Sequence, residues 1–183
     1  NMIYSSPTAQ QLISSDFIKT TLERLEDLNI NIDNTIDHKL PNSGKIGYIK
    51  NQELLINFYK ICLNVNKETG WDLDIDSIQP LIYQEYNSNY KSEWQVDQHS
   101  ELYKENNLRK ISFKVFLNDN FEGGEFDLDF LGPNKDKRFQ TFDNSISANT
   151  SLFFHSYNWY RINPIKSGVM KTLSGFILGP KYA

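Results

Sequence analysis

Apolar and polar positions along the chain change their period near residue 70. Before this point, two segments place apolar residues at the three- and four-residue spacing of an amphipathic helix. The first contains Phe17, Ile18, Leu22, Leu25 and Leu28, and the second contains Leu54, Leu55, Phe58, Tyr59, Cys62 and Leu63. Asn51 precedes the second segment as an N-cap candidate, and Gly70 follows it as a C-terminal stop. The pattern predicts helices near residues 15–29 and 51–68.

After Gly70 the apolar residues gather in short runs that are typical of strands, with turns such as Glu122-Gly123-Gly124 between them. The predicted strands cover residues 81–86, 110–117, 125–130, 151–155, 160–165 and 171–178. No repeat and no long linker separates the two halves. We therefore expect one domain over residues 1–183, mainly β within the α+β class. Residues 1–72 would give helical support to a β core over residues 73–183.

Composition and charge narrow the function classes. The chain has 183 residues, 39% of them hydrophobic, and its net charge of −4 comes from interspersed acidic and basic residues. No basic stripe is present, so we expect no nucleic-acid partner. No run of about eighteen apolar residues and no signal-peptide pattern occurs, so we expect no membrane partner and a cytoplasmic protein. The abundance of Asn, Ile, Lys and Tyr is typical of an AT-rich genome, such as that of a bacterium or phage.

Two features with chemical potential are better explained as structure. Cys62 is the single cysteine and has apolar neighbours, which favours a buried thiol without a catalytic role. Asp72, Asp74 and Asp76 alternate along the chain but lack the glycine and glutamate of a calcium loop. We interpret them as a solvated polar face.

Four segments carry a family resemblance. They are YQEYNSNYKSEWQVD at residues 83–97, LRKISFKVFLND followed by NFEGGEFDL, FHSYNWYRINPI at residues 154–165, and SGVMKTLSGFILGP at residues 167–180. In this order and spacing, the chain from Tyr83 to Tyr182 resembles the 2-oxoglutarate and iron(II)-dependent oxygenases of the prolyl-4-hydroxylase-like type. The resemblance implies a double-stranded β-helix, a jelly roll of the cupin-like kind, with N-terminal supporting helices.

The metal ligands that the resemblance implies are two histidines and one carboxylate, placed on one face so that co-substrate and oxygen can bind. The aspartate of the family's H-x-D pair is kept as Asp97, but its histidine position holds Gln95 and the distal histidine position holds Tyr160. A carboxamide is a weak ligand compared with imidazole, and a phenol with a pKa of about 10 must first lose its proton. We expect Gln95 and Tyr160 not to function as iron ligands.

The co-substrate end departs from the family pattern as well. The family's arginine, which binds the far carboxylate of 2-oxoglutarate, would stand two residues after Gly168, and that position is Met170. Lys171 points to the opposite strand face. Phe116 stands where the family often has a co-substrate tyrosine, whereas Tyr86 is kept where another family tyrosine lines the pocket.

Two replacements for the lost groups remain open. Lys114 lies on the central strand, from which some branches of the superfamily hold 2-oxoglutarate with a lysine. Because unpaired lysines are rarely buried, we prefer a surface or edge position for it. Asp97, His99 and His155 are the second option for a rebuilt metal site, and here we prefer solvated loop histidines.

We conclude that the sequence favours a catalytically degenerate oxygenase-like protein, or pseudo-oxygenase, that acts by binding or assembly and has no catalytic residues. No cofactor is then expected, and the partner is an unknown protein or small ligand, with a homo-oligomer as an open alternative. A second hypothesis is an active dioxygenase with an altered metal site, which would need Fe(II) and 2-oxoglutarate. A third is a lectin-like or small-ligand module that uses the vacated cavity. Iron content and stabilisation by 2-oxoglutarate would discriminate among them.

Overall fold

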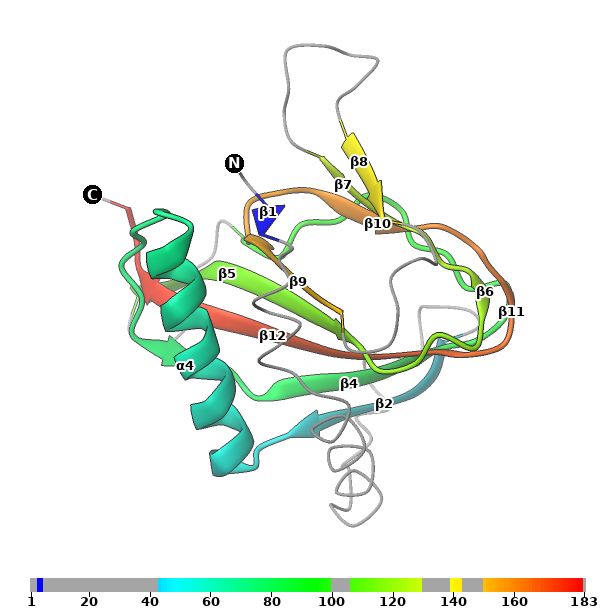
Figure 1. Ribbon diagram of the computed structural model, residues 1–183, viewed down its shortest axis with the longest axis horizontal. Helices are drawn as coiled ribbons and strands as arrows, with labels where there is room; N and C mark the ends of the chain where they lie inside the picture. Colours follow the sequence, from blue (N-terminus) through cyan, green and yellow to red (C-terminus); the bar gives the residue numbers. More distant parts are fainter. Residues whose placement is uncertain (1–2, 5–42, 100–105, 130–138, 143–149, 183) are drawn as a thin grey trace.

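The computed structural model describes residues 3–4, 43–99, 106–129, 139–142 and 150–182 (Figure 1). The helix expected near residues 15–29 lies outside the described residues. Within them, one helix packs against a system of antiparallel strands.

The larger sheet has seven strands, six of them in the order β1-β9-β5-β12-β4-β2, with β3 paired to β12 at one side. These strands are β1 (Ile3–Tyr4), β2 (Ser43–Ile49), β3 (Ser77–Ile78), β4 (Leu81–Tyr86), β5 (Asn107–Phe116), β9 (Ser151–His155) and β12 (Met170–Pro180). Every neighbouring pair is antiparallel. Strand β12 therefore lies at the centre, where β4 and β5 cover its two edges.

Two smaller sheets complete the β core. The first has the order β10-β7-β8 and the second pairs β11 with β6. Their strands are β6 (Glu122–Gly123), β7 (Phe126–Asp129), β8 (Phe139–Phe142), β10 (Tyr160–Ile162) and β11 (Ile165–Ser167). In Figure 1, β6 and β11 lie at the end of the larger sheet that is away from the helix. The predicted mainly β fold, a double-stranded β-helix with helical support, is confirmed.

Helix α4 (Gln52–Glu68) is the helix predicted near residues 51–68. Its first turn is capped as expected, because the Asn51 side chain accepts a hydrogen bond of 3.1 Å from the backbone N–H of Leu54. Gly70 ends the helical segment with a φ of 70°, a conformation that glycine adopts without strain. One face of the helix is buried and consists of Leu54, Leu55, Phe58, Cys62 and Val65. The buried thiol predicted for Cys62 is thus confirmed.

Side-chain alternation on the strands creates two separate cores. Phe113 and Phe153 point toward α4 and pack with Phe58 in the first core. Phe116 and Phe154 point the other way, into a second core. The smaller sheets contribute Phe126, Leu128, Tyr160, Ile162 and Ile165 to the second core. This inner space between the sheets contains the positions that the resemblance marks as functional.

The observed strands agree with the prediction in the β core, and the supporting region contains a strand that was not predicted. Strands β4 and β9 have the expected bounds, and the run predicted over residues 160–165 divides into β10 and β11. Strand β2 lies within residues 1–72, where only helical support was expected, and pairs with β4. Its segment SGKIGYI contains two glycines, which weaken a strand signal. Residues 72–76 form no strand, and Asp72, Asp74 and Asp76 are exposed.

Candidate functional site

Gln95 and Tyr160 are direct neighbours in the backbone. The N–H of each residue donates a hydrogen bond of 2.8 Å to the carbonyl of the other, which forms an isolated antiparallel bridge. Residues paired in this way project their side chains to the same face. The structure therefore brings together the two positions at which the resemblance implies histidines.

Asp97 completes this group. The Tyr160 hydroxyl donates a hydrogen bond of 2.8 Å to Asp97 Oδ1, and both side chains are only 8% exposed. Burial raises the pKa of Tyr160 well above 10, and the nearby Asp97 raises it further. The ring of Tyr160 also stacks on Phe126 with 5.2 Å between centroids. Tyr160 is thus a neutral phenol, fixed by packing and by its hydrogen bond to Asp97.

Lys114 lies inside the protein, and the preferred surface position was wrong. The residue is 5% exposed, and its Nζ lies 3.2 Å from the Tyr86 hydroxyl and 2.9 Å from the Ser174 hydroxyl. Its register partners on the two strands that flank β5 are Leu152 on β9 and Ser174 on β12. Lys114 therefore projects from the inner face of the larger sheet. Burial lowers the pKa of Lys114 to about 8, while the attraction of Asp97 acts in the opposite direction.

Met170 lies beside Tyr86 at the start of β12, where the two residues are register partners. Both are buried in the second core together with Phe116. Lys171 follows on the opposite strand face, where its register partner is Glu85. The position of the family's arginine thus carries an uncharged thioether, while Lys114 on the adjacent strand β5 places a cation on the inner face of the sheet.

Among the described residues, His99 and His155 do not form a metal-binding group with Asp97. His99 is exposed, whereas His155 is 7% exposed and lies on strand β9, so the expected solvated loop position is wrong for His155. Its ring packs against Trp71 and Tyr157 at centroid distances of 4.4 and 4.8 Å. Because Phe154 faces the second core, His155 faces away from it. Burial lowers the pKa of His155 to about 4.

Comparison with known proteins gives matches among solved structures alone. No protein-family model and no curated protein matches the sequence. A prolyl-4-hydroxylase from Pseudomonas putida aligns with a TM-score of 0.68 at 13% identity, over 98% of this chain and 93% of that one. The viral collagen prolyl hydroxylase of Paramecium Bursaria Chlorella virus-1, solved as a 2OG complex, aligns with a TM-score of 0.67 at 12% identity, over 99% and 97%. The chain has the fold of the prolyl-4-hydroxylase-like 2-oxoglutarate oxygenases.

A third neighbour of this oxygenase fold is an oxidoreductase of the 2OG-Fe(II) oxygenase family from Burkholderia pseudomallei. It aligns with a TM-score of 0.62 at 11% identity, over 97% of this chain and 86% of that one. These neighbours correct one expectation from the sequence. The absence of any cofactor was expected, whereas Fe(II) and 2-oxoglutarate are the cofactors that the neighbours of this fold suggest.

The residues of this chain fit the two suggested cofactors unequally. Among the described residues, no group of three or more His, Cys, Asp or Glu side chains is placed to hold a metal ion. Asp97 is the carboxyl group at the implied iron position, and its Oδ1 already accepts the Tyr160 hydrogen bond. The implied set of two histidines and a carboxylate is therefore not reproduced. For the dicarboxylate 2-oxoglutarate, the buried ammonium of Lys114 is a suitable partner.

Sequence reasoning missed Ser174, which binds Lys114. Its position offered a signal, because Ser174 lies four residues after Met170 on the same strand, and residues at even spacing share a strand face.

In the part of the chain that the structure describes, no helix has the length and apolar character needed to cross a membrane.

Proposed function

We propose that this protein is a catalytically degenerate oxygenase-fold protein that binds a small carboxylate, 2-oxoglutarate or a close analogue, on Lys114 without converting it. The observation that supports this proposal most is the buried ammonium group of Lys114 on the inner face of the larger sheet.

The environment of Lys114 favours an anionic ligand. A pKa of about 8 leaves this lysine mainly protonated at neutral pH. Its two hydrogen-bond partners among the described residues are hydroxyl groups, of Tyr86 and Ser174. Burial raises the pKa of Tyr86, so this phenol is neutral. A buried cation is costly unless an anion compensates it. The attraction of Asp97 compensates Lys114 only in part, because its pKa stays lowered, and a bound carboxylate would supply further negative charge.

The side chains at the implied catalytic positions support binding without conversion. Tyr160 keeps its proton and donates a hydrogen bond to Asp97 Oδ1, so the phenol is not a tyrosinate ligand and one oxygen of Asp97 is already engaged. Gln95 brings a carboxamide to the same face, and Met170 brings no charge to the co-substrate end. The scaffold would thus hold a carboxylate while lacking the ligand set for oxygen activation.

Calorimetric titration with 2-oxoglutarate at neutral pH tests this function. We expect saturable binding by the wild type and a loss of affinity of at least about 100-fold in Lys114→Met, because a buried charge-assisted contact is removed. Lys171→Met is the matched control, since Lys171 lies on the opposite strand face, and it should bind like the wild type. Equal binding by wild type and Lys114→Met, or no binding by the wild type, would contradict the proposal.

One observation favours a second candidate, an active dioxygenase with an altered metal site. Gln95, Asp97 and Tyr160 place three oxygen-bearing groups together. If a bound cation displaced the phenolic proton of Tyr160 to solvent, these groups could act as oxygen ligands. Formation of succinate by the wild type from 2-oxoglutarate, with ferrous iron and ascorbate present, would favour this candidate over the first.

A further inference from the structure

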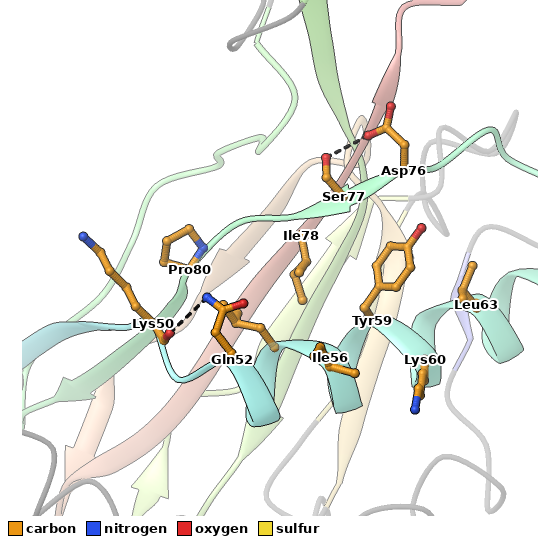
Figure 2. Close-up of a pocket in the computed structure, with 11 residues that line it drawn as sticks. Lys50, Gln52, Ile56, Tyr59, Lys60, Leu63, Asp76, Ser77, Ile78 and Pro80 are labelled. Atoms are coloured by element: carbon orange, nitrogen blue, oxygen red, sulfur yellow. Dashed lines mark hydrogen bonds between the residues drawn. The ribbon is translucent and has the colours of Figure 1, made fainter.

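A groove of about 570 Å³ lies on the outer side of the molecule, between α4 and the segment that contains β3 (Figure 2). Its apolar wall consists of Ile56, Tyr59, Leu63, Ile78 and Pro80. The groove lies on the α4 side of the larger sheet, whereas the second core and Lys114 lie on the opposite face, so the groove is distinct from the site around Lys114.

The helix carries a second apolar stripe that faces this groove. Ile56 and Leu63 are 50% and 43% exposed, and Tyr59 lies between them at the spacing that aligns side chains along one helix face. The face of α4 that includes Phe58 and Cys62 already packs on the larger sheet. Isolated surface apolar residues are common, but a stripe along a groove is typical of an interaction surface.

Opposite charges mark the two ends of the groove. Lys50 lies where β2 leads into α4, and Asp76 lies at the other end, beside Ser77 and on the same side as Tyr59 (Figure 2). Asp76 Oδ1 accepts hydrogen bonds from the Ser77 hydroxyl at 2.7 Å and from Asn107 Nδ2 at 3.1 Å, which hold the exposed carboxylate in place.

We propose that this groove is the interface through which two copies of the chain form a two-fold symmetric dimer. A two-fold axis near Tyr59 would align the two α4 helices antiparallel, so that the apolar stripe of one copy covers that of the other. The same rotation brings Lys50 of each copy to Asp76 of the other, because these charges lie at opposite ends. A surface with this arrangement is complementary to itself, as a two-fold interface requires.

Sedimentation velocity over a range of about 1 to 100 µM tests for the dimer, since mass action makes its fraction depend on concentration. We expect the wild type to dimerise and Ile56→Glu to weaken dimerisation by at least about tenfold, because a charge replaces an apolar contact. Asn57→Glu adds the same charge at an exposed neighbouring helix position outside the groove and should dimerise like the wild type. A wild type that stays monomeric, as it would if another partner used the groove, overturns the proposal.

Exchanging the charges at Lys50 and Asp76 tests whether a second copy of the chain occupies the groove. Lys50→Glu and Asp76→Lys should each weaken self-association by about tenfold, since each places like charges together twice. An equimolar mixture of the two variants should regain the wild-type affinity, because both contacts in the mixed dimer then join opposite charges. Lys166→Glu, at an exposed site on β11, should leave dimerisation unchanged. Failure of the mixture of folded variants to associate overturns the two-fold arrangement.

Discussion

Tyr160 donates a hydrogen bond of 2.8 Å to Asp97, and this pair joins two distant segments of the chain inside the second core. Tyr160 begins β10, while Asp97 follows the bridge residue Gln95. At these positions the resemblance implies ligands of one iron ion. In this chain, Tyr160 and Asp97 instead contact each other directly, as a neutral phenol and a carboxyl group.

The Tyr160–Asp97 hydrogen bond should contribute measurably to stability. Tyr160→Phe keeps the stacked ring but leaves the buried Asp97 oxygen without this donor, which costs about 1 to 3 kcal/mol of unfolding free energy. Urea unfolding monitored by circular dichroism measures this change.

Tyr182→Phe is the control for the loss of a hydroxyl, because Tyr182 is 48% exposed and its hydroxyl contact to Gln98 is long at 3.5 Å. Its unfolding free energy should stay within about 0.5 kcal/mol of the wild type. Unchanged stability of Tyr160→Phe would mean that the pair is not formed in solution.

Lys114 should make stability depend on pH on the alkaline side. Its pKa is about 8 in the folded protein and near the ordinary 10.5 after unfolding, so the unfolded state binds more protons between these values. Stability therefore rises with pH in this window, by at most about 1.4 kcal/mol per pH unit. Below pH 8 both states are protonated, and the cost of burying the charge is fully present.

Lys114→Met removes this titration. From about pH 8 to about pH 10, the free energy of unfolding of the wild type should therefore rise relative to that of the variant. Thermal unfolding of both proteins across this range gives the difference directly. A difference that does not vary with pH would contradict the buried position of this ammonium group.

His155 should act on the acid side with the same sign, because its folded pKa is lowered too. Burial lowers its folded pKa from 6.5 to about 4, so the unfolded state takes up a proton first. The wild type should lose stability as pH falls from 6.5 toward 4. His155→Phe, which preserves a ring between Trp71 and Tyr157, should lose less over the same range. Parallel curves for the two proteins would show that His155 is accessible to protons in the folded state.

The β core could be predicted from the sequence because its strands are long, apolar and separated by clear turns. Strand β9 is buried at every residue, and helix α4 has both its cap and its stop encoded locally. Strand β2 escaped prediction because glycines interrupt its pattern and its place depends on pairing with β4, a contact between distant segments.

Spacing identified the positions of the candidate site, whereas the environment of each side chain depended on the fold. Motif spacing identified Gln95, Asp97 and Tyr160, which the structure places together. The burial of Lys114 was predicted wrongly, because a general preference of lysine for the surface outweighed the strand alternation that directs it inward. The outcome for His155 was similar: a solvated loop position was preferred for it, although the strand predicted over residues 151–155 already included this residue.

Succinate formation from 2-oxoglutarate, with ferrous iron and ascorbate, should distinguish the wild type from the triple variant Gln95→His, Tyr160→His, Met170→Arg. The variant restores the implied ligands and carboxylate partner at positions that the fold already brings together. Because such groups act as a unit, single changes should not suffice. We predict slow succinate formation by the triple variant and none above the protein-free control by the wild type. Succinate formation by the wild type, or a folded triple variant that forms none, would contradict a catalytically degenerate site on an intact oxygenase scaffold.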